Sequence, residues 1–211
     1  IMHILDELQQ HGTTIILVTH HRDEFANADR IIRLDNGRIV QSARGNTASI
    51  PEMDESGTAQ EDNPIAKSNI ANGASKPTSA VPIIDIRNLT YQYPNSNKPV
   101  LDKLSITINE GETVAITGHN GAGKTTLARL LCALEQPQSG SITINTIPVA
   151  RQRANGNMQS LKRADREKLR ATIGYVMQHP ERQLFAETVA EDVAYGPRNQ
   201  RLDEAQVDEH V

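Results

Sequence analysis

The sequence predicts an α/β fold with a mainly parallel core sheet. Residues 14–18 and 113–117 are short apolar runs, typical of parallel strands that are covered on both faces. Residues 83–93 alternate between apolar and polar side chains, as strands with one buried face do. A glycine-rich loop at residues 118–125 follows the second apolar run, and a helical pattern at 126–134 follows the loop. This order of strand, loop and helix indicates where a ligand binds.

The loop reads GHNGAGKT and matches the phosphate-binding pattern GxxxxGK[ST] at every fixed position. Glycines let the backbone wrap closely around an anion, and the N-terminus of the next helix adds partial positive charge. The lysine would neutralise the β- and γ-phosphates, and the threonine hydroxyl would hold Mg²⁺. A chance match is expected in on the order of one per cent of chains this long. We therefore expect a nucleotide site made by Gly118, His119, Asn120, Gly121, Ala122, Gly123, Lys124, Thr125 and Thr126.

The composition limits the other partners. The 211 residues are 37% hydrophobic and 3% aromatic, with a net charge of −4, so no basic surface predicts nucleic-acid binding. One cysteine, Cys132, leaves no internal disulfide and suits a reducing cytoplasm. The seven histidines lack metal-ligand spacing, so no zinc site is expected. No apolar run approaches the ~18 residues of a membrane span, and no signal peptide is visible, so any membrane role is expected to come through a partner.

The first forty residues predict a helix, a strand and a hairpin. Residues 1–10 place their apolar side chains on one helical face, and residues 14–18 form the strand that follows. His20 comes at the carboxyl end of this strand, where open α/β sheets bind ligands, although chemistry alone does not exclude His21. After a short helix at 23–28, Asp35-Asn36-Gly37 predicts a tight turn between strands 31–34 and 38–40.

A flexible linker is expected from residue 41 to residue 81. This stretch is rich in Ser, Asn, Ala, Gly, Pro, Thr and acids, with isolated apolar residues and no periodicity. Such a composition buries too little surface to offset the entropy of ordering. The sequence therefore predicts three parts: residues 1–40, the linker 41–81, and residues 82–211.

The third part alternates strands and helices. Residues 151–160 are polar and predict no regular structure, and Gly196-Pro197 predicts the end of the helix before it. We expect strands at 83–93, 100–108, 140–145 (an edge strand) and 173–176, and helices at 161–170, at 188–195 and from Asp203.

These motifs resemble those of ABC-transporter ATPases. Residues 118–126 are similar to the Walker A loop of that family, and Gln178 to its Q-loop glutamine, which ligates Mg²⁺ and orients the attacking water. Tyr93 stands where the family keeps an aromatic that stacks on adenine, although Tyr91 shares its face. His20 is similar to the switch histidine that contacts the γ-phosphate. The resemblance implies a P-loop NTPase fold with an antiparallel β subdomain, and ATP with Mg²⁺ as ligand.

Two family motifs are missing from the chain. The sequence has neither an LSGGQ-like signature nor a strand that ends in the Asp-Glu pair of a Walker B motif. Residues 1–40 resemble the end of an ABC domain, and residues 82–211 resemble the front of a second one. We expect an incomplete fold, a fragment of a tandem ATPase. Because each ATP lies between two such domains in the family, we expect this chain alone to bind nucleotide weakly without turnover.

The stretch from Gln178 to Pro197 is similar to the Q-loop region of energy-coupling-factor ATPases, the cobalt and vitamin importers. The resemblance implies a transmembrane coupling subunit as partner, a second ABC domain, and a place at the cytoplasmic face of the membrane. The leading hypothesis is thus the ATP-hydrolysing subunit of a micronutrient importer. Alternatives are a soluble tandem ABC protein acting on ribosomes, disfavoured by the acidic, non-helical linker, and a non-catalytic nucleotide-binding module. A sugar-importer tandem ATPase is a close variant of the leading hypothesis.

The resemblance also suggests a contact between the two halves. The switch-histidine strand of the family lies beside the P-loop strand. Residues 14–18 are therefore expected to be able to dock beside residues 113–117, with His20 facing Lys124.

Overall fold

The computed structural model describes residues 2–19, 27–44 and 81–211. The chain divides into two compact units, Ile1–Lys162 and Arg163–Val211. The expected helix at 23–28 and the expected linker lie almost entirely outside the described residues.

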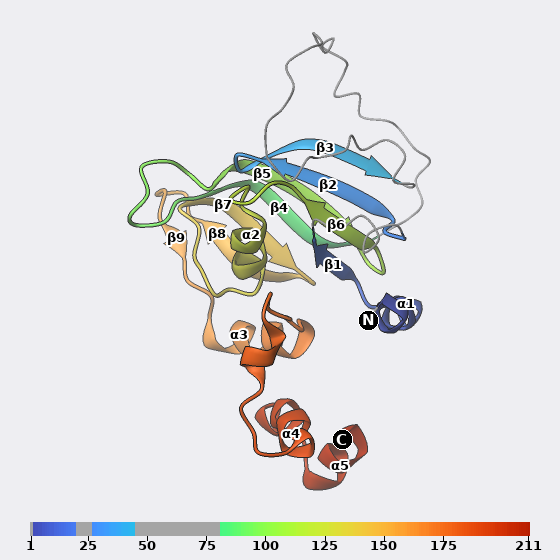
Figure 1. Ribbon diagram of the computed structural model, residues 1–211. Coiled ribbons are helices and arrows are strands. Elements are labelled where there is room, and N and C mark those ends of the chain that lie inside the picture. The colour runs from blue at the N-terminus through green and yellow to red at the C-terminus, as the bar shows by residue number, and fades with distance from the viewer. Residues whose placement is uncertain (1, 20–26, 45–80) are drawn as a thin grey trace. The chain divides into compact units, whose positions relative to one another are not determined.

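The first unit contains a four-stranded sheet with strand β6 (Thr113–Thr117) inside it (Figure 1). β6 pairs in parallel with β1 (Ile15–Val18) on one side and with β2 (Arg30–Asp35) on the other. All five residues of β6 are buried, which confirms a parallel strand covered on both faces. The expected docking of the strand at 14–18 beside β6 is also confirmed.

β2 continues into a hairpin with β3 (Arg38–Arg44). Asn36 and Gly37 have φ angles of 45° and 74°, the left-handed pair that a tight two-residue hairpin turn requires. β3 extends to Arg44, four residues past the expected end at Val40, because Arg44 pairs with Arg30 across the ladder. The polar residues at the end of β3 are in the strand because their main chain pairs with β2. The pattern of apolar residues in the sequence does not predict this pairing.

A second, antiparallel sheet has the strand order β5-β4-β7-β8-β9. Strands β4 (Pro82–Tyr91) and β5 (Leu101–Asn109) confirm two expected strands to within two residues at each end. Two expectations were wrong. β7 (Ser139–Ile144) is not an edge strand, since β8 (Ile147–Gln152) pairs with it. Residues 151–160 are not structureless either. After β8 the chain turns at Gly156, and β9 (Met158–Gln159) pairs with β8.

Helix α2 (Lys124–Leu131) follows β6 and buries its apolar face. Leu127 and Leu130 have no exposed surface. They belong to a core whose fully buried side chains come from both sheets, among them Ile32, Leu34, Ile86, Leu104, Ile116 and Ile142. Helix α1 (Met2–Gln10) has no buried residue, and Ile4 and Leu8 are exposed on it.

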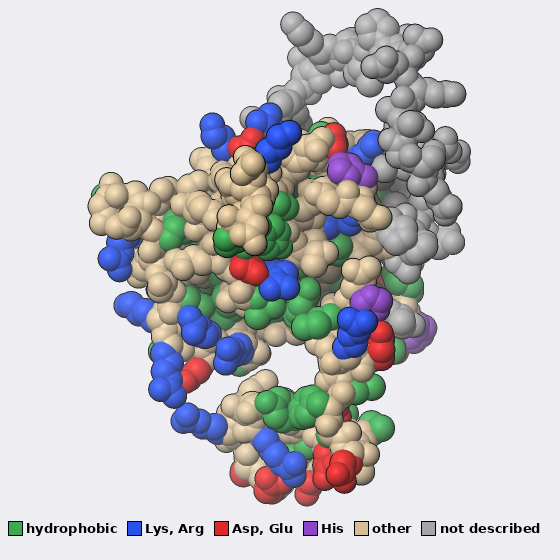
Figure 2. Space-filling model, turned by 60° about the vertical axis from the view of Figure 1, so that its left-hand side comes forward, with side chains coloured by type: hydrophobic (Ala, Val, Ile, Leu, Met, Phe, Trp, Pro, Cys, Tyr) green, Lys and Arg blue, Asp and Glu red, His purple; other side chains and the backbone are tan. Residues whose placement is uncertain are grey.

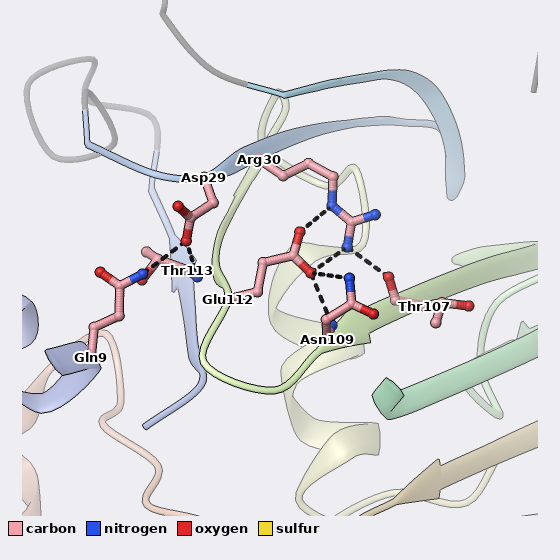
Figure 3. Close-up of polar contacts among 7 residues, drawn as sticks. All are labelled: Gln9, Asp29, Arg30, Thr107, Asn109, Glu112 and Thr113. Atoms are coloured by element: carbon pink, nitrogen blue, oxygen red, sulfur yellow. Dashed lines mark hydrogen bonds and ion pairs between the residues drawn. The ribbon is translucent and has the colours of Figure 1, made fainter. Parts of the chain in front are cut away.

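Polar contacts join the two halves of this unit at the amino end of β6 (Figure 3). Arg30 donates to the carbonyl oxygen of Thr107 at 2.6 Å and to Glu112 Oε2 at 3.2 Å. Its Nε lies 2.8 Å from Glu112 Oε1, an ion-pair distance, although the N–H does not point at that oxygen. Asn109 donates its main-chain N–H to Glu112 Oε2 at 2.9 Å.

A second group of contacts in Figure 3 centres on Asp29. Its Oδ2 accepts from the main-chain N–H of Thr113 and from Gln9 Nε2, both at 2.8 Å. Residues from positions 9–30 are therefore hydrogen-bonded to residues from positions 107–113, across the segment that separates them in sequence.

The second unit contains helices α3 (Arg163–Thr172), α4 (Val189–Asn199) and α5 (Glu204–His210), with a 3₁₀ turn η3 (Pro180–Gln183). Thr188 caps α4 by accepting from the N–H of Glu191, and Asp203 caps α5 in a capping box with Gln206. The α5 start at Asp203 is confirmed.

Two expectations for this unit were wrong. Residues 173–176 form no strand, because none of the described strands pairs with them, and Val176 is 76% exposed. α4 does not end before Gly196-Pro197 but runs through them to Asn199. Pro197 lies in the last turn, so its missing N–H costs a single helical bond.

Candidate functional site

The loop between β6 and α2 depends on three glycines with positive φ. Gly118, Gly121 and Gly123 have φ angles of 144°, 84° and 102°. A Cβ on Gly118 would collide with the carbonyl oxygen of Leu34, and one on Gly123 would lie 2.7 Å from Leu101 Cδ2. The glycines are thus required by backbone conformation and, at two positions, by close packing. Gly121 faces open space, so only its conformation requires glycine.

Lys124 begins α2 and folds its side chain back over the loop. Its Nζ donates to the carbonyl oxygens of Gly118 at 2.6 Å and His119 at 2.9 Å. Burial lowers the pKa of the Lys124 ammonium. The N-cap residue Gly123 offers no side chain to the first helical N–H groups, which have no partner within the helix. An ammonium and uncapped N–H groups at a helix start suit an anion.

The two threonines after the lysine differ in exposure. Thr125 is exposed, as a residue whose hydroxyl holds a metal ion needs to be. Thr126 is only 5% exposed. Thr126 Oγ1 lies 3.1 Å from the hydroxyl of Tyr93, which links the loop helix to the end of β4.

Tyr91 and Tyr93, the two candidates for stacking on a base, differ in burial. Tyr91 is 3% exposed, donates to Glu135 at 2.9 Å, and packs edge-on against Tyr93 with ring centroids 5.0 Å apart. Burial, reinforced by Glu135, raises the pKa of Tyr91 to about 12. A buried ring offers no face to a base, so of the two only the partly exposed Tyr93 is available for stacking.

The turn of the β2–β3 hairpin touches the loop, which the sequence did not indicate. Gly37 donates its N–H to the carbonyl oxygen of Ala122 at 3.2 Å. Asp35 Oδ1 lies 2.8 Å from His119 Nε2. The Asp-Asn-Gly pattern predicts a turn, but no local signal says what the turn packs against, since its neighbour is more than eighty residues away.

Two expected site residues are not joined to this loop by the structure. His20 lies outside the described residues, and so does His21. Gln178 is exposed and belongs to the second unit, which is described by itself. Within the described ranges, no group of His, Cys, Asp and Glu side chains has the arrangement of a metal site.

The second unit exposes apolar side chains around the expected partner region. Phe185 and Tyr195 are 65% and 53% exposed and meet edge-on at a centroid distance of 4.6 Å. Asp192 Oδ1 accepts from the main-chain N–H groups of Phe185 and Ala186, both at 3.1 Å, and so ties this loop to α4. Figure 2 shows hydrophobic side chains at the surface of this unit, with carboxylates at its lower end. No described helix is both long enough and apolar enough to span a bilayer.

Together, the glycine-built loop, the lysine over it and the helix behind it define a phosphate-binding loop of the nucleotide-binding kind. A family model described as "ABC transporter" matches residues 101–210. The chain belongs to this family and has the ABC ATPase fold.

Named relatives agree with this assignment. A Bifidobacterium longum protein, provisionally named as an ABC transporter ATP-binding protein, is 44% identical over the whole chain, which spans 30% of that relative. An energy-coupling factor transporter ATP-binding protein of Latilactobacillus sakei is 38% identical over 61% of the chain and 42% of its own length. The solved structure of cbiO1 from Clostridium perfringens, part of the ABC transporter complex cbiONQ, is 32% identical, with a TM-score of 0.50 over 61% of this chain and 47% of that one. The chain thus spans less than half the length of each.

Proposed function

We propose that this chain is the middle part of a tandem ABC ATPase that binds MgATP and energises a membrane importer of a micronutrient, a metal ion or a vitamin. The observation that supports it most is the loop of residues 118–125, in which three left-handed glycines and a half-buried lysine surround the start of α2. The energy-coupling-factor and cbiO1 relatives support the importer class, over 61% of the chain.

Each expected site residue has a role in this proposal. Lys124 leaves the carbonyl oxygens of Gly118 and His119 and pairs with the β- and γ-phosphates, while the exposed Thr125 hydroxyl ligates Mg²⁺. Tyr93 stacks on the adenine. Gln178 ligates Mg²⁺ and orients water, and His20 contacts a γ-phosphate, as the family resemblance implies.

The tandem arrangement is supported by the way one relative aligns. The Bifidobacterium longum protein matches the chain over its full length, so a single relative carries both regions and the stretch between them. We propose residues 1–40 as the end of one ABC domain, 41–81 as a linker, and 82–211 as the front of the next.

Sustained turnover requires residues that these 211 do not contain. Neither an LSGGQ-like signature nor a Walker B Asp-Glu pair occurs in the sequence. Phosphoryl transfer depends on positioning a water and neutralising charge at the γ-phosphate from several sides. We therefore propose that this chain binds nucleotide without steady hydrolysis, and that a second ABC domain completes the site.

The membrane partner is proposed to contact residues 178–197 from the cytoplasmic face. Exposed apolar side chains on a soluble unit commonly mark an interaction surface. Here they include Leu184, Phe185, Val189, Val193 and Tyr195. We propose that an apolar cytoplasmic segment of a transmembrane subunit covers them.

Nucleotide titration of the full chain tests the binding proposal. A fluorescent ATP analogue with Mg²⁺ is expected to bind, and Lys124→Ala to weaken binding by roughly tenfold or more, because a charge-assisted contact to phosphate contributes about 1.5–3 kcal/mol. Lys168→Ala, at an exposed lysine on α3, is the matched control and is expected to leave affinity unchanged. Equal affinity in all three proteins would contradict the proposed site.

The importer proposal needs the complete protein with its membrane subunit. Phe185→Asp is expected to abolish substrate uptake by reconstituted vesicles, since it places a charge in the proposed apolar contact, while nucleotide affinity stays the same. Glu187→Asp, at an exposed position two residues away, is the control. Uptake at the original rate with Phe185→Asp would exclude this surface as the coupling contact.

A further inference from the structure

The phosphate-binding loop is held from outside by the turn of an upstream hairpin. Gly118 packs so closely on the carbonyl oxygen of Leu34 that no Cβ fits between them, and Gly37 donates to the carbonyl oxygen of Ala122 at 3.2 Å. The loop therefore touches β2 at its first glycine and the hairpin turn four residues later. Neither contact involves a side chain of the hairpin. Apart from glycine, therefore, neither contact favours a particular residue type at the turn.

One side-chain contact does distinguish a residue. Asp35 Oδ1 lies 2.8 Å from His119 Nε2 and also accepts from Asn36 Nδ2 at 3.1 Å. The other ring nitrogen of His119, Nδ1, lies 2.6 Å from the carbonyl oxygen of Asn120. The His119 ring thus lies between two acceptors, a carboxylate on the hairpin and a main-chain carbonyl within the loop, and it donates to both when both ring nitrogens carry a proton. The orientation of the Asn120 carbonyl is linked to Asp35 through this ring.

Lys124 holds the same stretch of loop from the other side. Its Nζ donates to the carbonyl oxygens of Gly118 and His119. A bound phosphate competes for this ammonium, so binding removes the lysine from both carbonyls. The Asp35–His119 contact does not involve Lys124 and remains to hold the loop after the lysine has moved.

The exposure of the pair indicates what it contributes. The side chains of His119 and Asp35 are 40% and 43% exposed, and a pair this accessible typically adds little to the stability of the fold. Its effect on global stability is therefore small. Its effect on the loop is local, because it fixes one peptide whose N–H and C=O directions decide how the loop meets an anion.

We infer that Asp35 is a positioning residue for the nucleotide loop and acts through His119. The inference rests on the proposed nucleotide binding, because the loop is positioned for phosphate. It also means that a residue from the upstream part of the chain tunes a loop in the downstream part.

Asp35→Ala in the full chain tests this inference, with Asp102→Ala as the matched control. Asp102, on β5, pairs with Arg38 of the hairpin and, among the residues that the structure describes, forms no hydrogen bond or ion pair with residues 118–125. Asp35→Ala is expected to weaken MgATP binding by roughly three- to tenfold and to speed amide hydrogen exchange at residues 119–122 in the nucleotide-free protein. Asp102→Ala is expected to change neither, and Asp35→Asn, which keeps an acceptor oxygen, to restore most of the affinity.

A double-mutant cycle separates positioning from a general loss of structure. His119→Ala and Asp35→Ala are expected to weaken binding by similar factors, and the double variant by no more than the larger of the two. Multiplying effects would overturn the inference, as would unchanged exchange at residues 119–122 in Asp35→Ala. Absence of binding in the unaltered chain would instead count against the proposed nucleotide function, while the exchange measurement would still decide whether Asp35 holds the loop.

Discussion

The two ends of strand β6 differ in how their charged and polar groups are bonded. At the amino end, charged and polar side chains satisfy one another: Glu112 pairs with Arg30 and accepts from Asn109, and Asp29 accepts from Thr113 and Gln9. At the carboxyl end the chain is glycine-rich, its backbone is in left-handed conformations, and the lysine is bonded only to carbonyl oxygens of its own loop. Both ends join the same two halves of the unit.

The difference teaches how one strand can serve both stability and binding. A network in which most donors and acceptors are paired internally stabilises the fold but leaves little for a ligand to bind. A loop whose lysine is bonded to its own carbonyl oxygens, and whose helix N–H groups have no side-chain cap, can bind phosphate oxygens in their place. Variants at the carboxyl end should therefore alter nucleotide affinity, and variants at the amino end should alter only the free energy of unfolding.

Gly118→Ala is expected to have the largest effect. Its φ of 144° and the close Leu34 carbonyl both exclude a Cβ, so the loop must move or the strand must separate from β2. We expect a loss of about 3 kcal/mol or more in the free energy of unfolding and the loss of measurable nucleotide binding. Urea denaturation and nucleotide titration measure the two.

Gly121→Ala is the matched control for this substitution. Its φ is 84°, but nothing lies within 4 Å of an added Cβ, so only the conformational cost remains. We expect the free energy of unfolding to fall by about 1 kcal/mol in this variant. Similar losses in both variants would show that conformation alone, without the contact to β2, decides the cost.

Glu112→Gln tests the amino end and is expected to have an intermediate effect. The glutamine oxygen can replace Oε2, which accepts from both Arg30 and the Asn109 N–H, but the glutamine NH2 then replaces Oε1 and faces Arg30 Nε, and Arg30 is left without its counter-charge. We expect the free energy of unfolding to fall by about 2 kcal/mol with nucleotide affinity unchanged. A change in affinity larger than twofold would break the proposed division of roles between the two ends.

Tyr91→Phe is expected to have the smallest effect, and this effect changes with pH between 10 and 12. Because the pKa of Tyr91 is about 12 in the folded protein against an ordinary value near 10, the folded state keeps the phenol proton to higher pH than the unfolded chain does. Its contribution to stability is present below pH 10 and is lost as pH rises from 10 towards 12.

Urea unfolding at pH 9, 10 and 11 measures this loss in the unaltered protein and in Tyr91→Phe. The lowered pKa of Lys124 acts in the opposite direction, since the unfolded chain then binds the extra proton, but it is present in both proteins and cancels in the comparison. The unaltered protein should lose stability relative to Tyr91→Phe as pH rises. Parallel pH profiles would contradict the assignment, and Tyr93→Phe serves as the control at the neighbouring ring.

The local elements of the fold could be predicted from the sequence, with specific exceptions. The GHNGAGKT loop, the buried run before it, the hairpin turn at Asn36-Gly37 and the Asp203 cap each depend on residues within a few positions of one another. The expectations for residues 173–176 and 151–160 were wrong for the same physical reason. A strand is stabilised by its neighbour, so an apolar run without a described partner stays irregular, while the polar stretch around Gly156 finds a partner in β8.

The candidate site divides in the same way. The residues of the loop itself were predictable, because phosphate binding imposes a fixed pattern on adjacent positions. The family resemblance favoured Tyr93 over Tyr91, whereas the difference in burial between the two rings could not be read from the sequence, because it depends on contacts with Glu135 and Thr126 more than thirty residues away. The contact of Asp35 with the loop was not predicted, since no pattern near Asp35 in the sequence indicates a contact with His119.

The sequence by itself determined that this protein has a phosphate-binding loop between a buried strand and a helix, because glycine conformation and helix geometry act over a few residues. The tertiary structure alone decided that β1 and β2 flank that strand, that Glu112 and Asp29 close one end of it, and that Asp35 reaches the loop at the other. Those contacts join residues some 80 to 100 positions apart. Which of them form depends on how main-chain hydrogen bonds and buried charges are satisfied across the whole unit.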